Sequence, residues 1–236
     1  MSQTATEPRP RANARRPAGE RGNVRGEATR QRILDAAERL FAEHGISAVA
    51  LRDIGVAAGQ RNHAAVQYHF GDRDGLVAAL MESRGAQSES IRTDMVAELM
   101  LGGEVPTVAD VVAAFVRPLA IHVRPDNHYL AFLSLYITEE GGYEGLAPQG
   151  LHTGAAVVSL RALLAKLLPE VPAAVLDERW WVALTSAVHA LARYQSAQQK
   201  RAQAAKLDVL LDDLVVFLSA GLGAPLVPGD PRVATG

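Results

Sequence analysis

Apolar residues recur at helical spacing from Thr29 onward and divide the first part of the chain into short helices. The first set shares one face and is followed by Gly45, which predicts an amphipathic helix of about four turns. A second, shorter helix is expected to end at Gly59, because glycine readily adopts the left-handed conformation that often follows a helix. The inward residues are Ile33, Leu34, Ala37, Leu40 and Phe41 in the first helix, and Leu51, Ile54 and Ala58 in the second.

The third helix is unusually polar. Asn62 is expected to cap it, since an asparagine side chain accepts a hydrogen bond from a free backbone N–H. Val66 and Phe70 are four residues apart and share one face, so the opposite face is polar. That face presents His63, Ala64 and Gln67. A helix, a sharp turn and a polar-faced helix predict a helix-turn-helix, whose second helix reads base edges in the major groove of DNA.

The remainder of the chain also has helical periodicity and no convincing strand pair. A fourth helix begins at Asp72 with the residues DRDGLVAALMESR, and Pro118 is expected to kink or break the next one. The later helices are expected near residues 107–123, 127–138, 151–168, 173–200 and 206–221. The expected fold is therefore all-α, with an N-terminal three-helix helix-turn-helix domain and a larger C-terminal helical bundle.

Composition and charge place the positive charge at the start of the chain. Residues 1–80 hold 12 Arg, no Lys and 9 acidic residues (12 − 9 = +3), which leaves 12 basic and 17 acidic residues beyond (12 − 17 = −5). Residues 1–26 are rich in Arg, Pro, Gly and Ala and predict a disordered basic arm, which either contacts DNA phosphates or is a solvated leader without a role.

The 236 residues contain no cysteine, which excludes disulfides and thiolate metal sites. We expect a cytoplasmic protein with no membrane partner, because no apolar run is long enough to span a bilayer and no secretory signal precedes the first helix.

Three linked motifs resemble the DNA-binding domain of the TetR (tetracycline repressor) family. They are TRQRILDAAERLFAEHG, LRDIGVAAG and NHAAVQYHFGDRDGLVAAL, and the resemblance covers roughly residues 29–82. It implies that the recognition helix meets DNA through Asn62, His63, Ala65, Gln67 and His69, with Tyr68 beside the backbone. It also implies phosphate contacts from Arg52 and Arg73, consistent with the charge that phosphates need.

The chain departs from the family pattern in three places. The turn contains Gln60 and Arg61, one residue more than usual, and Val49 and Ala50 stand where the family has Thr or Ser. Gly55 replaces a usual Ala. The missing cap and this glycine each lower the stability of the second helix by up to about 1 kcal/mol. This predicts a helix-turn-helix that is less rigid in the free protein and becomes more ordered on DNA.

No motif in the sequence proposes catalysis, a metal site or a cofactor. His63 and His69 are six residues apart, which is the wrong spacing for a helical metal pair, and no Ser, His and acid spacing suggests a triad. A set of aromatic and histidine residues could instead line a pocket for a small, mostly apolar effector, as in the resembled family. The set is Phe115, His122, Tyr129, Phe132, Tyr136, Trp181 and His189.

Two apolar stripes near the C-terminal end predict a homodimer interface; the alternative is that they form intramolecular core. The first consists of Trp180, Leu184, Val188 and Leu191, and the second of Leu207, Leu211, Leu214 and Leu218. In the resembled family the last two long helices pair with their symmetry mates, and a two-fold dimer suits a two-fold operator.

The sequence favours a dimeric transcriptional repressor that leaves operator DNA when an effector binds. The expected divisions are a basic arm at 1–26, a helix-turn-helix domain at 27–75, an effector-binding and dimerisation domain at 76–222 and a flexible tail at 223–236. Two alternatives stay open: an all-helical enzyme or ligand carrier with an incidental helix-turn-helix, and a protein-binding adaptor on the same scaffold.

Overall fold

The structure is a computed structural model, and it describes residues 18–60, 62, 64–139, 154–200, 205–227 and 229, with side chains from Arg25 onward. Within these ranges the chain is helical and contains no strand, so the expected all-α fold is confirmed. Part of the expected basic arm and of the expected tail lies outside the described residues. The helix α1 (Ala18–His44) already includes residues expected to belong to the arm, because no proline follows Pro17 to interrupt it.

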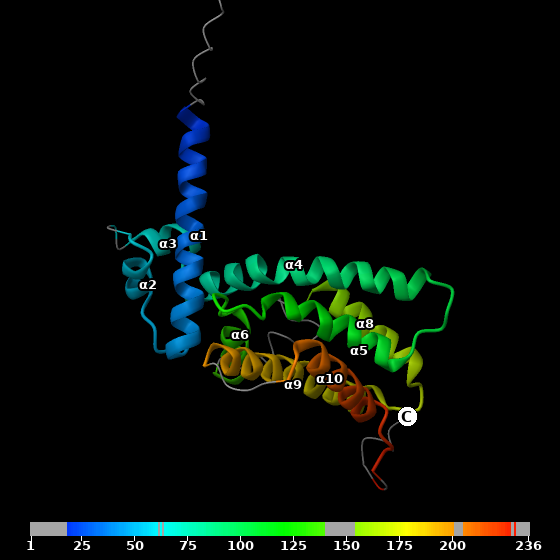
Figure 1. The fold of residues 1–236 in the computed structure, drawn as a ribbon. Coiled ribbons are helices and arrows are strands. Elements are labelled where there is room, and N and C mark those ends of the chain that lie inside the picture. Colours follow the sequence, from blue (N-terminus) through cyan, green and yellow to red (C-terminus); the bar gives the residue numbers. More distant parts are fainter. Residues whose placement is uncertain are drawn as a thin grey trace, which may run out of the picture.

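Three helices form the N-terminal unit. The long α1 crosses two short helices, α2 (Leu51–Ala57) and α3 (Ala65–Phe70), which lie to one side of it (Figure 1). Gly45 and Gly59 both adopt positive φ angles, 90° and 70°, as the turns after α1 and α2 require. Ile33, Leu34, Phe41, Ile54 and Val66 are buried where the three helices meet.

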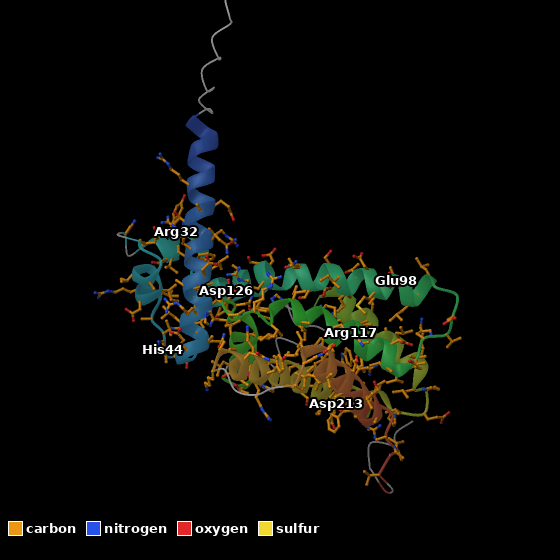
Figure 2. The ribbon with its side chains drawn as sticks, in the orientation of Figure 1. Arg32, His44, Glu98, Arg117, Asp126 and Asp213 are labelled. Atoms are coloured by element: carbon orange, nitrogen blue, oxygen red, sulfur yellow. The ribbon has the colours of Figure 1, made fainter. Side chains whose placement is uncertain are left out.

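The larger C-terminal unit is a layered helical bundle. Its helices are α4 (Arg73–Leu101), α5 (Val108–Leu119), α6 (Tyr129–Glu139), α8 (Ala155–Leu167), α9 (Ala173–Gln199) and α10 (Leu207–Leu222). In Figure 1, α4 runs along one edge of this bundle, and α9 and α10 lie on the opposite side. An ion pair of 2.6 Å between Arg117 Nη2 of α5 and Asp212 Oδ1 of α10 joins two of these helices; Figure 2 labels Arg117 and the neighbouring Asp213.

Two helix boundaries differ from the sequence expectation. The helix that begins after Asp72 continues to Leu101. Its inward face beyond Met81 carries Ser88, Arg92 and Val96. The two polar residues interrupt the apolar periodicity, so the sequence pattern did not reveal this extension. Pro118 lies inside α5 near its end, and the chain continues from Ala120 to His122 as a 3₁₀ turn. The expected break is therefore a tightening of the last turn.

Candidate functional site

The helix α3, expected from the sequence to be the recognition helix, exposes a small polar surface. Gln67 is exposed and the Tyr68 side chain is 85% exposed, whereas Val66 is buried beneath them. Ala65 and His69 are half-buried. On the neighbouring α2, Arg52 is exposed. His63 and Arg61 lie outside the described residues.

The start of α3 differs from the expected cap. The helix begins after Ala64, which has no side-chain cap, so Asn62 is not its N-cap. Asn62 Oδ1 instead accepts a hydrogen bond of 3.0 Å from the Ala64 N–H, two residues along, and thereby shapes the turn that leads into the helix. Ala50 likewise offers α2 no side-chain cap, as the sequence predicts.

Arg73 has a structural contact in addition to its expected contact with phosphate. It is half-buried, and its Nη1 donates a hydrogen bond to the carbonyl of Ile46, in the segment between α1 and α2. This bond ties the beginning of α4 to the helix-turn-helix. The phosphate contact implied for Arg73 stays a prediction. The exposed Arg52, in contrast, makes no hydrogen bond like that of Arg73 to another part of the chain within the described residues.

The junction between α3 and α4 is short and tightly packed. Gly71 ends α3 with φ 79°, and Asp72 caps α4 by accepting a 2.8 Å hydrogen bond from the Gly75 N–H. A Cβ atom added at Gly75 would lie 2.1 Å from the Phe70 carbonyl oxygen. The last turn of α3 therefore packs directly against the backbone of α4. The Arg30 guanidinium of α1 lies over the Phe70 ring, 5.3 Å from its centre.

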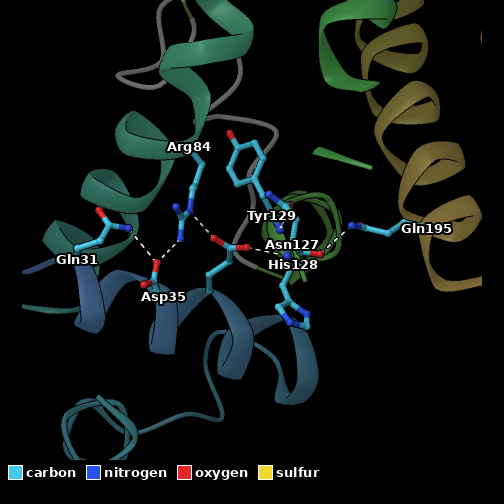
Figure 3. Close-up of polar contacts among 8 residues, drawn as sticks. Gln31, Asp35, Arg84, Asn127, His128, Tyr129 and Gln195 are labelled. Atoms are coloured by element: carbon cyan, nitrogen blue, oxygen red, sulfur yellow. Dashed lines mark hydrogen bonds and ion pairs between the residues drawn. The ribbon is translucent and has the colours of Figure 1, made fainter. Parts of the chain in front are cut away.

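A buried polar network connects the N-terminal unit with the bundle (Figure 3). Glu38 of α1 is 4% exposed; one carboxylate oxygen accepts from Arg84 Nε, and the other accepts from the His128 N–H at 2.7 Å. Arg84 of α4 also donates to Asp35 at 2.6 Å. Burial lowers the pKa of Arg84, but the two carboxylates more than offset this and raise its pKa above the ordinary value.

The same network reaches α9 through Gln195. This side chain is 3% exposed, and its Nε2 lies 2.7–2.9 Å from the carbonyl oxygens of His122, Arg124 and Asn127. These carbonyls belong to the segment that leads into α6, immediately before His128. One connected set of hydrogen bonds therefore joins α1, α4, the start of α6 and α9.

A cavity of about 310 Å³ lies within the bundle, next to this network. Its wall is formed by side chains from α4, α5, α6, α8 and α9, and is mostly apolar. Its polar groups come mainly from α4, as Ser88, Glu89 and Arg92, with Glu82 exposed at its edge. These features are typical of a small-molecule site, which is concave and mostly apolar and has few polar groups.

Only two of the seven expected pocket residues, Phe115 and Tyr129, line this cavity. His122 is buried behind it, with Nε2 3.5 Å from Ser88 Oγ and its ring 4.6 Å from that of Tyr129. Burial, assisted by Arg124, Arg84 and Arg92, lowers the pKa of His122 to about 4, so the ring is neutral at pH 7.

The other four expected residues do not line the cavity. Phe132 is fully buried and stacks between Phe41 of α1 and Tyr136, with ring centres 6.1 and 6.2 Å away. It therefore belongs to the core between α1 and α6. His189 Nδ1 lies 2.6 Å from Ser134 Oγ, which joins α9 to α6. Trp181 and Tyr136 are half-buried outside the cavity wall.

The comparisons with known proteins concern the N-terminal unit. Residues 33–80 match the family model described as "Bacterial regulatory proteins, tetR family". The helix-turn-helix of this chain is thus similar to the N-terminal DNA-binding domain of TetR-family regulators. Over 75 residues the chain is 36% identical to the HTH-type transcriptional repressor AcnR of Corynebacterium efficiens, a match that covers 31% of this chain and 39% of AcnR.

Two further similarities are more limited. An HTH-type transcriptional repressor of Mycobacterium tuberculosis is 46% identical over 55 residues, which is 23% of this chain and 29% of that protein. The matches thus span less than half the length of these relatives. A solved TetR-family regulator from Streptomyces coelicolor aligns over 89% of this chain and 99% of its own, with 18% identity and a TM-score of 0.39.

Outside the residues matched by the family model, both expected dimerisation stripes face the core of the protomer. Trp180, Leu184, Val188 and Leu191 are all at most 5% exposed, and Leu184 and Val188 line the cavity. In α10, Leu211 and Leu218 are buried and Leu207 and Leu214 half-buried, all packed against the core. The alternative of an intramolecular core therefore describes these stripes better. The exposed apolar residues of the two helices are Val182, Val209, Val216 and Phe217.

Two findings limit other classes of site in the part of the chain that the structure describes. No group of three or more His, Asp or Glu residues there is arranged to hold a metal ion. Among the same residues, no helix is both long and apolar enough to cross a bilayer.

Proposed function

We propose that this chain is a cytoplasmic transcriptional repressor that binds operator DNA as a homodimer and is released by a small molecule in the bundle cavity. The observation that carries the proposal is the exposed polar face of α3 in a TetR-family domain, held rigidly against α4. Two relatives with a similar helix-turn-helix are transcriptional repressors, which supports it.

In this proposal Gln67 reads a base and Arg52 binds a phosphate. A glutamine amide can pair with adenine N6 and N7, whereas a guanidinium neutralises phosphate charge without regard to sequence. Asn62, His63, Ala65, Tyr68 and His69 complete the proposed contact surface, and Arg73 is assigned to it through the guanidinium nitrogens other than the one bonded to Ile46.

The test begins with selection of bound fragments from a random duplex library at near-physiological salt, followed by binding measurements on the selected operator. Gln67→Ala is expected to cost about 1–3 kcal/mol at one base position and to relax specificity there. Arg52→Ala is the matched control, and should weaken every sequence similarly and reduce the salt dependence. Absence of an enriched motif, or equal loss across sequences for both variants, would contradict the proposal.

We further propose that the second copy docks on the solvent face of α9 and α10, rather than on the buried stripes. Val209 and Val216 are seven residues apart and share one face of α10, next to Phe217, and are 55%, 69% and 71% exposed. Val182 adds an apolar residue from α9, which packs beside α10. Contiguous exposed apolar residues of this kind mark protein interfaces, and a two-fold dimer would pair the same patch with itself.

Sedimentation velocity tests the dimer face. Phe217→Asp is expected to convert a dimer into a monomer and to reduce operator affinity, because a charge would be buried at the interface. Leu101→Asp is the matched control, since Leu101 is also exposed (84%) but lies at the end of α4. A dimer that survives Phe217→Asp unchanged would place the interface elsewhere.

The domain limits follow from this assignment. We propose that the DNA-binding unit extends to the start of α4, near residue 75, and that effector binding and dimerisation reside in 76–222.

A further inference from the structure

The chemistry of the cavity narrows the class of ligand that it can take. Its apolar wall includes Leu119, Leu133, Val157 and Val188. Arg92 is the one cation among the described residues that line it. Any ligand that fills the cavity must therefore either form a hydrogen bond with Arg92 or leave the hydrogen bonds of Arg92 unchanged.

Arg92 is buried with part of its hydrogen-bonding capacity unused. The residue is 5% exposed, and its guanidinium lies over the Phe115 ring, 5.2 Å from the centre. Nη1 donates to Glu89 Oε2 at 2.7 Å, but Nε has no hydrogen-bond partner. No other buried side-chain nitrogen or oxygen among the described residues lacks one. Since buried donors are nearly always paired, this N–H marks where an acceptor belongs.

The electrostatic balance at Arg92 decides whether that acceptor is charged. Glu89 already compensates the guanidinium, and its second oxygen accepts a 2.9 Å hydrogen bond from the Ala156 N–H at the start of α8. Glu82 adds another carboxylate at the edge of the cavity. The lining residues therefore carry two carboxylates against one guanidinium, so an anionic ligand would meet a net negative site.

A cationic ligand fits no better at this position. The atom that needs a partner is a donor, and an ammonium group is itself only a donor. Glu89 already compensates Arg92 and also accepts from the Ala156 N–H, so a cation at the buried end of the cavity would compete with Arg92 for the same carboxylate. His122, which lies behind Ser88, is neutral at pH 7 and brings no charge from the far side.

We propose that the cavity binds an uncharged, mostly apolar molecule whose carbonyl oxygen accepts a hydrogen bond from Arg92 Nε. Ketones, esters and amides share this acceptor. The inference rests on the proposed effector function of the same cavity and specifies its ligand class. Glu89 is then a positioning residue, because it holds the guanidinium in place through Nη1 and leaves Nε without a partner inside the protein.

The test uses four probes of nearly equal size on the full chain. Valerophenone carries a ketone, pentylbenzene has a methylene group in its place, and 5-phenylpentanoate and 5-phenylpentylamine carry a negative and a positive charge. Binding can be followed by tryptophan fluorescence, because Trp180 contacts Phe115 of the cavity wall with ring centres 5.7 Å apart. Valerophenone is expected to bind about tenfold or more tightly than pentylbenzene, as a hydrogen bond to a charged donor implies, and more tightly than either ion.

The variant Arg92→Lys tests the donor itself. Lysine keeps the positive charge and can pair with Glu89, but it has no N–H at the position of Nε. The ratio of the two dissociation constants is expected to fall to within about threefold of unity, with pentylbenzene affinity nearly unchanged. Val105→Ala, in the exposed segment between α4 and α5, should leave the ratio as in the wild type. Infrared spectra of bound valerophenone provide a readout that needs no variant: its carbonyl band should shift to lower frequency than in an apolar solvent.

Equal affinity for valerophenone and pentylbenzene, preference for either ion, absence of binding by all four probes, or an unshifted carbonyl band would overturn the inference. Operator binding by the same preparation separates this result from the proposed function. Operator binding without ketone preference would overturn only the ligand class. Ketone preference in a protein that selects no duplex would overturn the repressor assignment and leave the ligand class standing.

Discussion

Replacing Glu38 by glutamine removes the charge at the centre of the network that joins α1 to the bundle. The Glu38 carboxylate is buried and accepts from both Arg84 Nε and the His128 N–H. A glutamine amide offers only one acceptor oxygen, so its NH₂ group must face either the guanidinium or the backbone N–H.

The structure sets the size of the expected loss. Removing one partner of a buried ion pair costs about 3–5 kcal/mol, because the remaining charge stays buried without compensation. Here the Arg84 side chain is 25% exposed and keeps its 2.6 Å ion pair with Asp35, so the expected loss lies at about 2–3 kcal/mol. In the proposed repressor, the variant should also weaken the coupling of ligand binding to DNA binding, since Arg84 directly precedes the cavity residue Gly85.

Urea unfolding of Glu38→Gln and Glu43→Gln measures this loss against a matched control. Glu43 is on the same helix and pairs with Arg39 at 3.4 Å, but both side chains are more than 40% exposed. Glu43→Gln is therefore expected to change the free energy of unfolding by less than about 0.5 kcal/mol. Equal losses in the two variants would refute the reasoning that burial, and not the ion pair as such, makes Glu38 important.

Two further predictions concern the same region. His122 has a pKa of about 4 in the folded chain against 6.5 ordinarily, so the unfolded chain binds a proton at His122 more readily than the folded chain. The contribution of neutral His122 to the free energy of unfolding is therefore complete above pH 6.5 and is lost as the pH falls towards 4. Unfolding measured across this window should show a loss of about 3 kcal/mol that is missing in His122→Asn, and identical pH slopes would exclude His122 as its source. Gln195→Leu should cost about 1–3 kcal/mol by leaving buried carbonyls unpaired, whereas Gln198→Leu, exposed on the same helix, should be nearly neutral in thermal or urea unfolding. If Gln198→Leu destabilised the chain as much, helix propensity and not the carbonyl contacts would explain the result.

The helix-turn-helix could be predicted from the sequence because its local signals agree. Gly45 and Gly59 have the positive φ angles expected of helix stops, and Val66 is buried beneath the polar face of α3 as its spacing predicts. The start of α3 was misplaced, because an asparagine can cap a helix or bend the turn before it, and the residue type does not distinguish the two.

The cavity could not be predicted from residue types because an aromatic side chain serves a core as well as a pocket. Phe132 joined Phe41 in the core between α1 and α6, a contact across 91 positions that no local pattern reveals. Arg92 was missed because its inward position on α4 depends on a helix that continues beyond Arg84, where the expected helix ended. The spacing of Ser88, Arg92 and Val96, each four residues apart, was the available signal.

The leucine stripes show a related limit. Spacing of 4, 3 and 4 residues predicts which face of α10 is covered, but not which helix covers it. In the structure α5 and α9 both pack against α10, and the Arg117–Asp212 ion pair joins α5 to α10.

In the proposed homodimer, the direct contact between Gly75 and the end of α3 would divide the recognition of an operator between two parts of the chain. Since the last turn of α3 packs against the backbone of α4, the identity of each half-site would depend on the side chains of α3, whereas the distance between half-sites would depend on how the bundles hold the two α4 helices apart. A change of bases and a change of spacing would then arise from substitutions in different domains, so each property can be altered in evolution or by design while the other is kept.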